Sequence, residues 1–141
     1  MNRPRTLLLD NEALQALADP NHPKHRRALA IVHEFALRRL RATASAGPFV
    51  PAAVRVEAGW DRRSAATVIL NRLRILDLPL DRDSADHAAA IRTSLNVSVA
   101  DAHLGASVIA TPGPHAVATS DVGDMRKIAE HLGAAVNIAR L

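Results

Sequence analysis

The sequence predicts an α/β protein, built as a three-layer α/β/α sandwich with a central, mainly parallel sheet. Short apolar runs alternate along the chain with segments of helical periodicity. A parallel connection needs a crossover long enough to hold a helix, so this alternation favours a parallel sheet with helices on both faces. The length of 141 residues, without an evident linker or repeat, fits a single domain over residues 1–141.

The first half of the chain is predicted to contain two strands. Thr6–Leu9 is a continuous apolar run, as expected for a strand buried on both faces of a sheet. Asn21 is a good N-cap for the longest helix, and Pro51 is well placed to begin another. The predicted elements are strand 6–9, helix 12–18, a long helix ending near Ala44, strand 49–50, a helix from Pro51 that carries Glu57, and a periodic helical segment over 62–74.

The second half continues the alternation. Ser98 lies three residues before Asp101, so it can cap a helix whose first turn contains that acid. The segment 111–114 contains two prolines and a glycine and breaks the chain, and Gly133 ends the last helix. The predicted elements are an edge strand over 75–80, helix 81–95, a helix ending near Ala110, strand 116–119, helix 124–132 and a strand over 135–139.

Two acidic residues directly follow predicted strands. Asp10 follows the first strand, and Asp121 follows strand 116–119. In open parallel sheets the ligand crevice lies beyond the carboxyl ends of the strands, so both carboxylates are expected there. Converging carboxylates must share protons, pair with arginine or hold a cation, and hard divalent ions prefer oxygen ligands. Taken singly, each acid also has an ordinary explanation as a helix cap or a solvated side chain.

Charge and composition limit the classes of function that are plausible for this protein. Net charge is +4, and arginine suits bidentate phosphate contacts, so a nucleic acid is a candidate partner, although solvated helix faces also explain an arginine excess. The candidates for phosphate contact are Arg55, Arg62, Arg63 and Arg126. The absence of cysteine excludes thiolate chemistry and cysteine zinc sites. No signal peptide or membrane span is expected, which predicts a cytoplasmic protein.

Four segments, in this order, resemble the PIN domains, and among them the VapC-type toxins of bacterial toxin–antitoxin pairs. The segments read LLLDNEAL from Leu7, VPAAVRVE from Val50, VADAHLGA from Val99 and VATSDVGDM from Val117. The likeness covers nearly the whole chain. Each segment is short, and their combination carries the resemblance.

The resemblance implies an acidic catalytic site. Asp10, Glu57, Asp101 and Asp121 match the family's four acidic residues and are the predicted catalytic residues. Asp10, Asp101 and Asp121 are also predicted metal ligands, with Asp124 as a further ligand that replaces or assists Asp121. The implied cofactor is Mg²⁺ or Mn²⁺, which would activate a water molecule for phosphodiester hydrolysis.

Two further residues are implied to support these acids. Asn11 stands where the family often has Ser or Thr, and an amide can also hydrogen-bond a ligand or a water molecule. Thr119 matches a family hydroxyl that orients the acidic group. By contrast His103 and His115 are interpreted as structural, because a single histidine in an apolar segment is more often a packed residue than a ligand.

The function that the resemblance implies is a metal-dependent endoribonuclease, the toxin of a toxin–antitoxin pair. Its partners would be an RNA substrate, an antitoxin and a second copy in a homodimer. The alternative is a PIN-like module that binds RNA or protein without cutting. A haloacid-dehalogenase phosphatase is disfavoured, because that family needs a second Asp where this chain has Glu12, and receiver domains need a lysine after a late strand.

Overall fold

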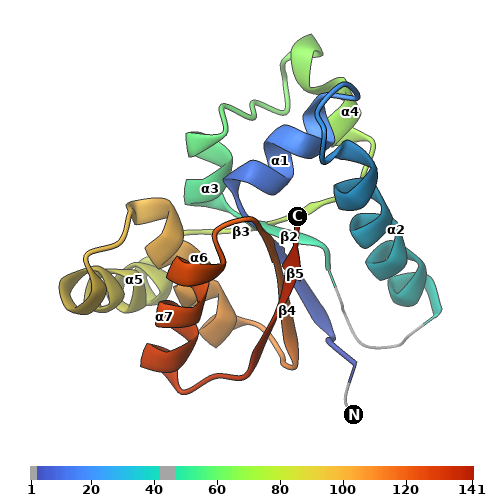
Figure 1. Ribbon diagram of the computed structural model, residues 1–141. Coiled ribbons are helices and arrows are strands. Elements are labelled where there is room, and N and C mark those ends of the chain that lie inside the picture. Colours follow the sequence, from blue (N-terminus) through green and yellow to red (C-terminus); the bar gives the residue numbers. More distant parts are fainter. Residues whose placement is uncertain (1–2, 42–46) are drawn as a thin grey trace.

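A computed structural model describes residues 3–41 and 47–141, and it confirms the predicted α/β class. A five-stranded sheet lies between helices on both faces (Figure 1). Every strand pair is parallel, in the order β3-β2-β1-β4-β5. The described elements are β1 (Thr6–Leu9), α1 (Asn11–Ala18), α2 (His25–Arg41), β2 (Phe49–Pro51), α3 (Ala52–Glu57), η1 (Ala65–Thr67), α4 (Val68–Asn71), β3 (Leu76–Leu78), α5 (Arg82–Leu95), α6 (Val99–Ala110), β4 (His115–Thr119), α7 (Val122–Leu132) and β5 (Val136–Arg140).

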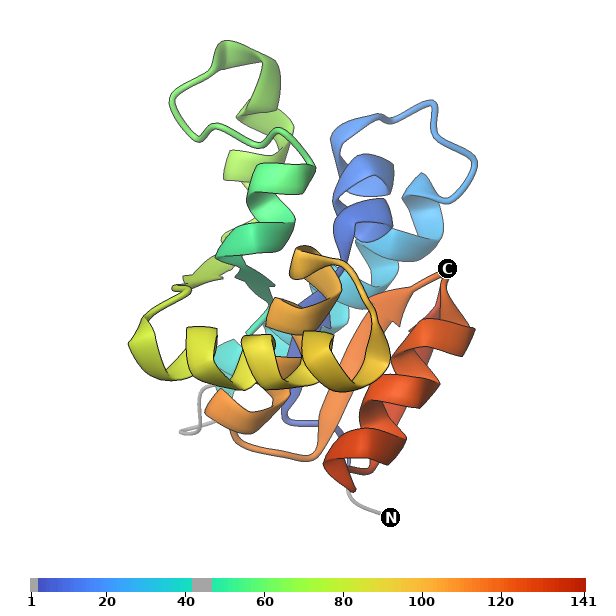
Figure 2. The ribbon, with the colours of Figure 1, turned by 90° about the vertical axis from the view of Figure 1, so that its left-hand side faces the viewer.

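The central strand β1 is buried on both faces, as its apolar run predicts. Leu7 and Leu9 pack with residues of α1 and α2, whereas Leu8 packs with residues of α6 and α7. This division follows from the alternation of side chains along a strand. All three leucines are fully buried. The helix α5 packs on the outside of α6 rather than directly on the sheet (Figure 2).

The strand order creates a switch point between β1 and β4. From β1 the chain passes through α1 and α2 to β2 on one side, and from β4 it passes through α7 to β5 on the other side. Neighbouring strands whose connections leave in opposite directions open a crevice beyond their carboxyl ends, where α/β proteins bind ligands. Asp10 and Asp121 follow these two strands.

A glycine lets α6 lie close to its helical neighbours. A Cβ atom added to Gly105 would lie 2.8 Å from Ile128 Cγ2 on α7 and 2.9 Å from Ile91 Cδ1 on α5. Any side chain at this position would push the helices apart, because the surrounding core is close-packed. Gly105 therefore helps to fix the position of α6, which carries Asp101 at its beginning.

One predicted helix is wrong. The segment 62–74 contains only the short turns η1 and α4, because side chains bond its backbone locally and compete with a continuous helix. Thr67 Oγ1 donates to the carbonyl of Asp61 at 2.6 Å, and Asn71 Nδ2 donates to the carbonyl of Arg62 at 2.8 Å.

The other predicted boundaries hold within a few residues. The long helix begins at His25 rather than directly after Asn21, and its predicted end near Ala44 lies outside the described residues. The last helix begins at Val122, two residues before its predicted start. Among the described residues, none of the helices combines the length and the apolar character needed to cross a membrane.

Candidate active site

Asp10 is the most buried of the candidate acids. It follows β1 and caps α1, where its Oδ1 accepts a hydrogen bond from the backbone N–H of Ala13 at 2.8 Å. Burial raises the pKa of Asp10 from 3.8 to about 6. Hydrogen bonds from Thr119 and Ala13 oppose this rise, and the charges of Glu12 and Asp101 add to it. Ionising Asp10 in the folded protein is therefore less favourable than ionising a free Asp side chain.

Thr119, the last residue of β4, connects Asp10 to Asp121. Its buried hydroxyl group hydrogen-bonds the Asp10 carboxyl group, which lowers the pKa of Asp10. The same oxygen accepts a hydrogen bond from the backbone N–H of Asp121 at 2.9 Å. Asp121 in turn caps α7, its Oδ1 accepting from the backbone N–H of Asp124 at 3.1 Å. The ends of β1 and β4 are thus joined through one side chain.

Asp101 brings a third segment to the same place. It lies in the first turn of α6, where the Ser98 hydroxyl accepts from its backbone N–H at 3.0 Å, as the sequence predicts. Burial raises the pKa of Asp101, and the negative charges of Asp124, Asp121 and Glu57 raise it further. The candidate acids at the end of α3 and at the start of α7 therefore lie close enough to repel Asp101.

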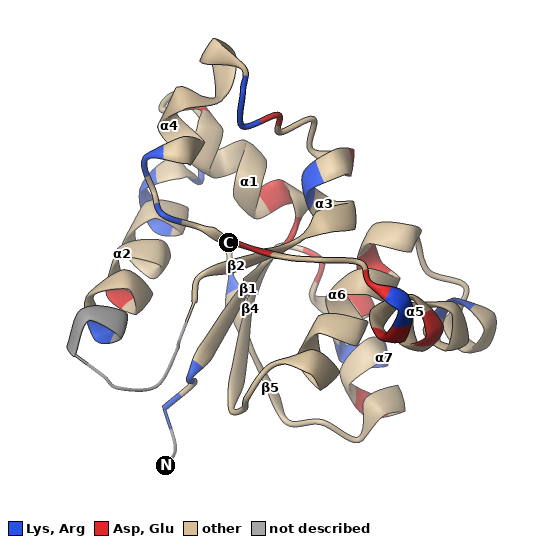
Figure 3. Cartoon of the chain, turned by 180° about the vertical axis from the view of Figure 1, so that it is seen from behind, with Lys and Arg blue, Asp and Glu red and all other residues tan. Residues whose placement is uncertain are grey.

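Glu57 is the last residue of α3 and is exposed at the edge of this acidic group. Asn11 Nδ2 donates to Glu57 Oε1 at 3.3 Å, so the residue after Asp10 holds the fourth predicted acid. Figure 3 shows acidic segments gathered at the end of the sheet where α1, α3 and α6 come together. All four predicted acids therefore belong to one region of the protein.

A second polar group, which was not predicted, lies beside Asp10. Glu12 Oε1 pairs with Lys24 Nζ at 2.7 Å, and the Ser120 hydroxyl donates to Glu12 Oε2. These bonds lower the pKa of Glu12, Lys24 first and Ser120 second. The group ties the start of α1 to the residue after β4. Glu12 lies in the first turn of a helix that Asp10 caps, and this position was the available signal.

The two histidines have structural roles. His103 is fully buried, its Nδ1 accepting from the backbone N–H of Ala53 at 3.2 Å and its Nε2 lying 3.3 Å from the carbonyl of Pro79. His115 Nε2 lies 3.0 Å from the carbonyl of Thr111. Burial lowers the pKa of both imidazoles. His103 joins the start of α3 to α6 and so helps to place Glu57 beside Asp101.

The donor chemistry fits a hard divalent cation. In the described part of the chain neither Asp10 nor Asp101 forms an ion pair with Lys or Arg, and Lys127 Nζ lies 3.7 Å from Asp124 Oδ1. Burial, and to a lesser extent the neighbouring negative charges, raise the pKa of Asp10 and Asp101, and a bound cation would favour the ionised form of both carboxyl groups. No three acidic or histidine side chains among residues 3–41 and 47–141 form a preformed cage. Mg²⁺ commonly takes one or two carboxylates together with water and phosphate oxygens.

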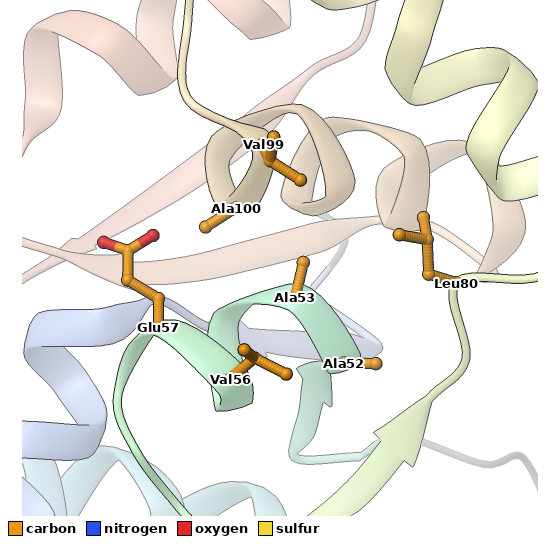
Figure 4. A pocket seen from close by; sticks show the side chains of 7 residues that line it. All are labelled: Ala52, Ala53, Val56, Glu57, Leu80, Val99 and Ala100. Atoms are coloured by element: carbon orange, nitrogen blue, oxygen red, sulfur yellow. The ribbon is translucent and has the colours of Figure 1, made fainter.

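An apolar groove adjoins these acids. It has a volume of about 460 Å³ and is lined by Ala52, Ala53, Val56, Glu57, Leu80, Val99 and Ala100. Figure 4 shows Glu57 as the one charged side chain among aliphatic ones, with α3 and the start of α6 forming opposite walls. One border of the acidic site is therefore an apolar surface.

Comparison with known proteins does not identify a family. No family model matches this chain, and no curated protein matches it at a significant level of similarity. The acidic site therefore rests on the sequence and on the geometry described above.

Proposed function

We propose that this protein is a metal-dependent endoribonuclease of the PIN-domain kind. The observation that carries the proposal is the convergence of acids from distant parts of the chain at the sheet's switch point. The charges of Asp121, Asp124 and Glu57 act on Asp101, and the charge of Asp101 acts on Asp10. Burial together with these charges disfavours the ionised forms of Asp10 and Asp101, and such perturbed carboxyl groups are typical of a functional site rather than a structural one.

Each residue of the site has a separate role in the proposed hydrolysis. Asp10 and Asp101, assisted by Asp121 and Asp124, would hold Mg²⁺ or Mn²⁺. When bound, such an ion polarises the phosphate and lowers the pKa of a water molecule. Thr119 keeps Asp10 oriented, and Asn11 keeps Glu57 at the edge, where its carboxylate would accept a proton from the attacking water. Water attacks phosphorus, the bond to the leaving ribose oxygen breaks, and that oxygen takes up a proton.

The proposal is tested by cleavage of single-stranded RNA with purified protein. We expect cutting in Mn²⁺, none in excess EDTA, and a loss of at least about a hundredfold in Asp10→Asn and in Asp101→Asn, because several kcal/mol of transition-state stabilisation would be lost. Asp86→Asn, at an exposed position on α5, is the matched control and should cut normally.

The products distinguish this mechanism from others. Attack by water leaves no 2′,3′-cyclic phosphate, whereas attack by the neighbouring 2′-hydroxyl group does. Cutting that survives EDTA and both substitutions would contradict the proposal. Binding of RNA without cutting would identify the non-catalytic module. The antitoxin and the homodimer remain predictions of the family resemblance, and the cytoplasmic location remains a prediction from the sequence.

A further inference from the structure

A second groove shares a wall residue of α3 with the apolar one. It has a volume of about 460 Å³, like its neighbour, and Val56 lines both. The residues that line it are Arg55, Val56, Gly59, Trp60, Asp61 and Arg63. Arg55 and Val56 lie on α3, which ends at Glu57, so one short helix carries residues of this groove and a candidate catalytic acid. We call it the arginine groove.

Two arginines at this groove share one carboxylate. Arg55 Nη1 pairs with Asp77 Oδ1 at 2.9 Å, and Arg62 Nε pairs with Asp77 Oδ2 at 3.0 Å. Two guanidinium groups on one acid leave one positive charge without compensation. Arg62 also lies over the Trp60 ring, 4.2 Å from its centroid, and Arg55 lies 6.0 Å from it. The two cations are therefore held in place before a ligand arrives.

The third arginine, Arg63, can exchange its carboxylate partner for a phosphate group. The Arg63 side chain is 90% exposed, and it pairs with Asp61, two residues earlier in the same loop. An exposed pair of this kind contributes little to stability, so a phosphate group can replace the carboxylate at small cost. Arginine binds phosphate with two parallel hydrogen bonds, which favours this exchange.

The wider charge distribution favours an anionic ligand here. Residues 1–74 contain thirteen of the eighteen Lys and Arg residues but only six of the fourteen acidic residues. Figure 3 shows basic segments on α2, at α4 and in the connection that follows α3. The arginine groove therefore belongs to the half of the chain that carries most of the basic residues, and α3 connects it to the acidic site. A polyanion reaching Glu57 from this side meets positive charge first.

We propose that the arginine groove binds the phosphate backbone of a single-stranded polynucleotide and directs it to the acidic residues, an inference that rests on the proposed nuclease function. Arg55 and Arg63 contact phosphates, and Arg62 supports the groove from behind by sharing Asp77 with Arg55 and packing on Trp60. Trp60 is 3% exposed, so its ring supports the arginines and does not stack on bases. Backbone contacts of this kind position a strand without reading its sequence.

The test measures binding apart from cutting. A labelled twelve-nucleotide oligouridylate is titrated in EDTA, with its anisotropy and the fluorescence of Trp60 as readouts. Trp60 is the sole tryptophan, so its signal reports on this groove. We expect Arg63→Gln to bind roughly tenfold more weakly, the loss of one charge-assisted hydrogen bond. The slope of log affinity against log salt should fall by about 0.7.

Two further variants make the result specific. Asp61→Asn removes the carboxylate that competes for Arg63, so it should bind more tightly than the natural protein. Arg82→Gln removes an exposed cation from α5 and should leave the affinity within about twofold, as expected for a residue outside the groove. Opposite effects of Arg63→Gln and Asp61→Asn cannot arise from unfolding.

The outcomes separate this inference from the nuclease proposal. If the natural protein cuts the oligonucleotide in Mn²⁺ but all variants bind it equally, the arginine groove is not the binding site and the nuclease stands. If the variants change binding as expected but no protein cuts, the groove stands and the nuclease proposal falls. Absence of binding by the natural protein overturns the groove directly.

Discussion

Replacing Asp10 with Asn is expected to stabilise the fold. At neutral pH the protein must keep an ionised Asp10 carboxylate in a place that raises its pKa from 3.8 to about 6, with burial as the main cause. This shift corresponds to about 3 kcal/mol of unfavourable free energy, at about 1.4 kcal/mol per pKa unit. Asn is neutral, and its amide oxygen can still cap α1 by accepting from Ala13. We expect a gain of about 1–3 kcal/mol in EDTA at pH 7.5.

Asp10 makes the stability of the natural protein depend on pH. Between pH 3.8 and about 6 the folded protein holds the Asp10 proton more tightly than the unfolded chain does. Rising pH therefore removes stability from the natural protein across this window, and the loss is complete above it. The variant lacks this group, so the difference in unfolding free energy between the two proteins should grow across the window and then stay level.

Urea unfolding of both proteins at a series of pH values measures this difference. Asp86→Asn serves again as the matched control, because its exposed position on α5 predicts little change. If the unfolding free energy of Asp10→Asn at pH 7.5 were equal to or below that of the natural protein, the fold would not disfavour the ionised Asp10 carboxylate. The case for a functional acid at this position would then fail.

Replacing Thr119 with Val is expected to weaken both the fold and the site. The variant keeps the shape of the buried side chain but loses the acceptor for the Asp121 backbone N–H and the hydrogen bond to Asp10. A buried group left without its partner costs about 1–3 kcal/mol. The loss of the Thr119 hydrogen bond also raises the pKa of Asp10 further, so the pH profile of cleavage should shift upward.

Thr119→Ser separates the hydroxyl group from the rest of the side chain. Serine keeps the hydrogen-bonding oxygen and loses one methyl group, so its pH profile should match that of the natural protein. Thermal unfolding and cleavage rates between pH 5 and 8 give the two readouts. If Val and Ser shifted the pH profile equally, the link between Thr119 and Asp10 would have no functional role.

Local patterns in the sequence predicted most of the fold, since the period of each pattern matched the element it formed. The apolar run Thr6–Leu9 became a strand with both faces covered, and Ser98 capped α6 as expected. The prediction of a continuous helix over 62–74 was wrong, because the side chains of Thr67 and Asn71 hydrogen-bond the local backbone instead. Periodicity carries no information about such bonds.

The candidate site was predictable to different extents. Asp10 and Asp121 follow strands, so parallel pairing alone places them at one edge of the sheet. Asp101 and Glu57 lie on helices, and only the family resemblance indicated that they point to the same edge. Glu12 was not predicted as part of the site, because its partners Lys24 and Ser120 come from other segments. Contacts between segments distant in sequence have no local signature.

We propose that acids from four segments of the chain form one cation-binding site. Titration calorimetry with Mn²⁺ at pH 7.5 tests this claim most directly, using the natural protein, Asp10→Asn, Asp101→Asn and the control Asp86→Asn. We predict saturable binding to the natural protein and to the control, and its loss in the two site variants. Binding that is absent from the natural protein, or that is equal in all four proteins, would contradict it.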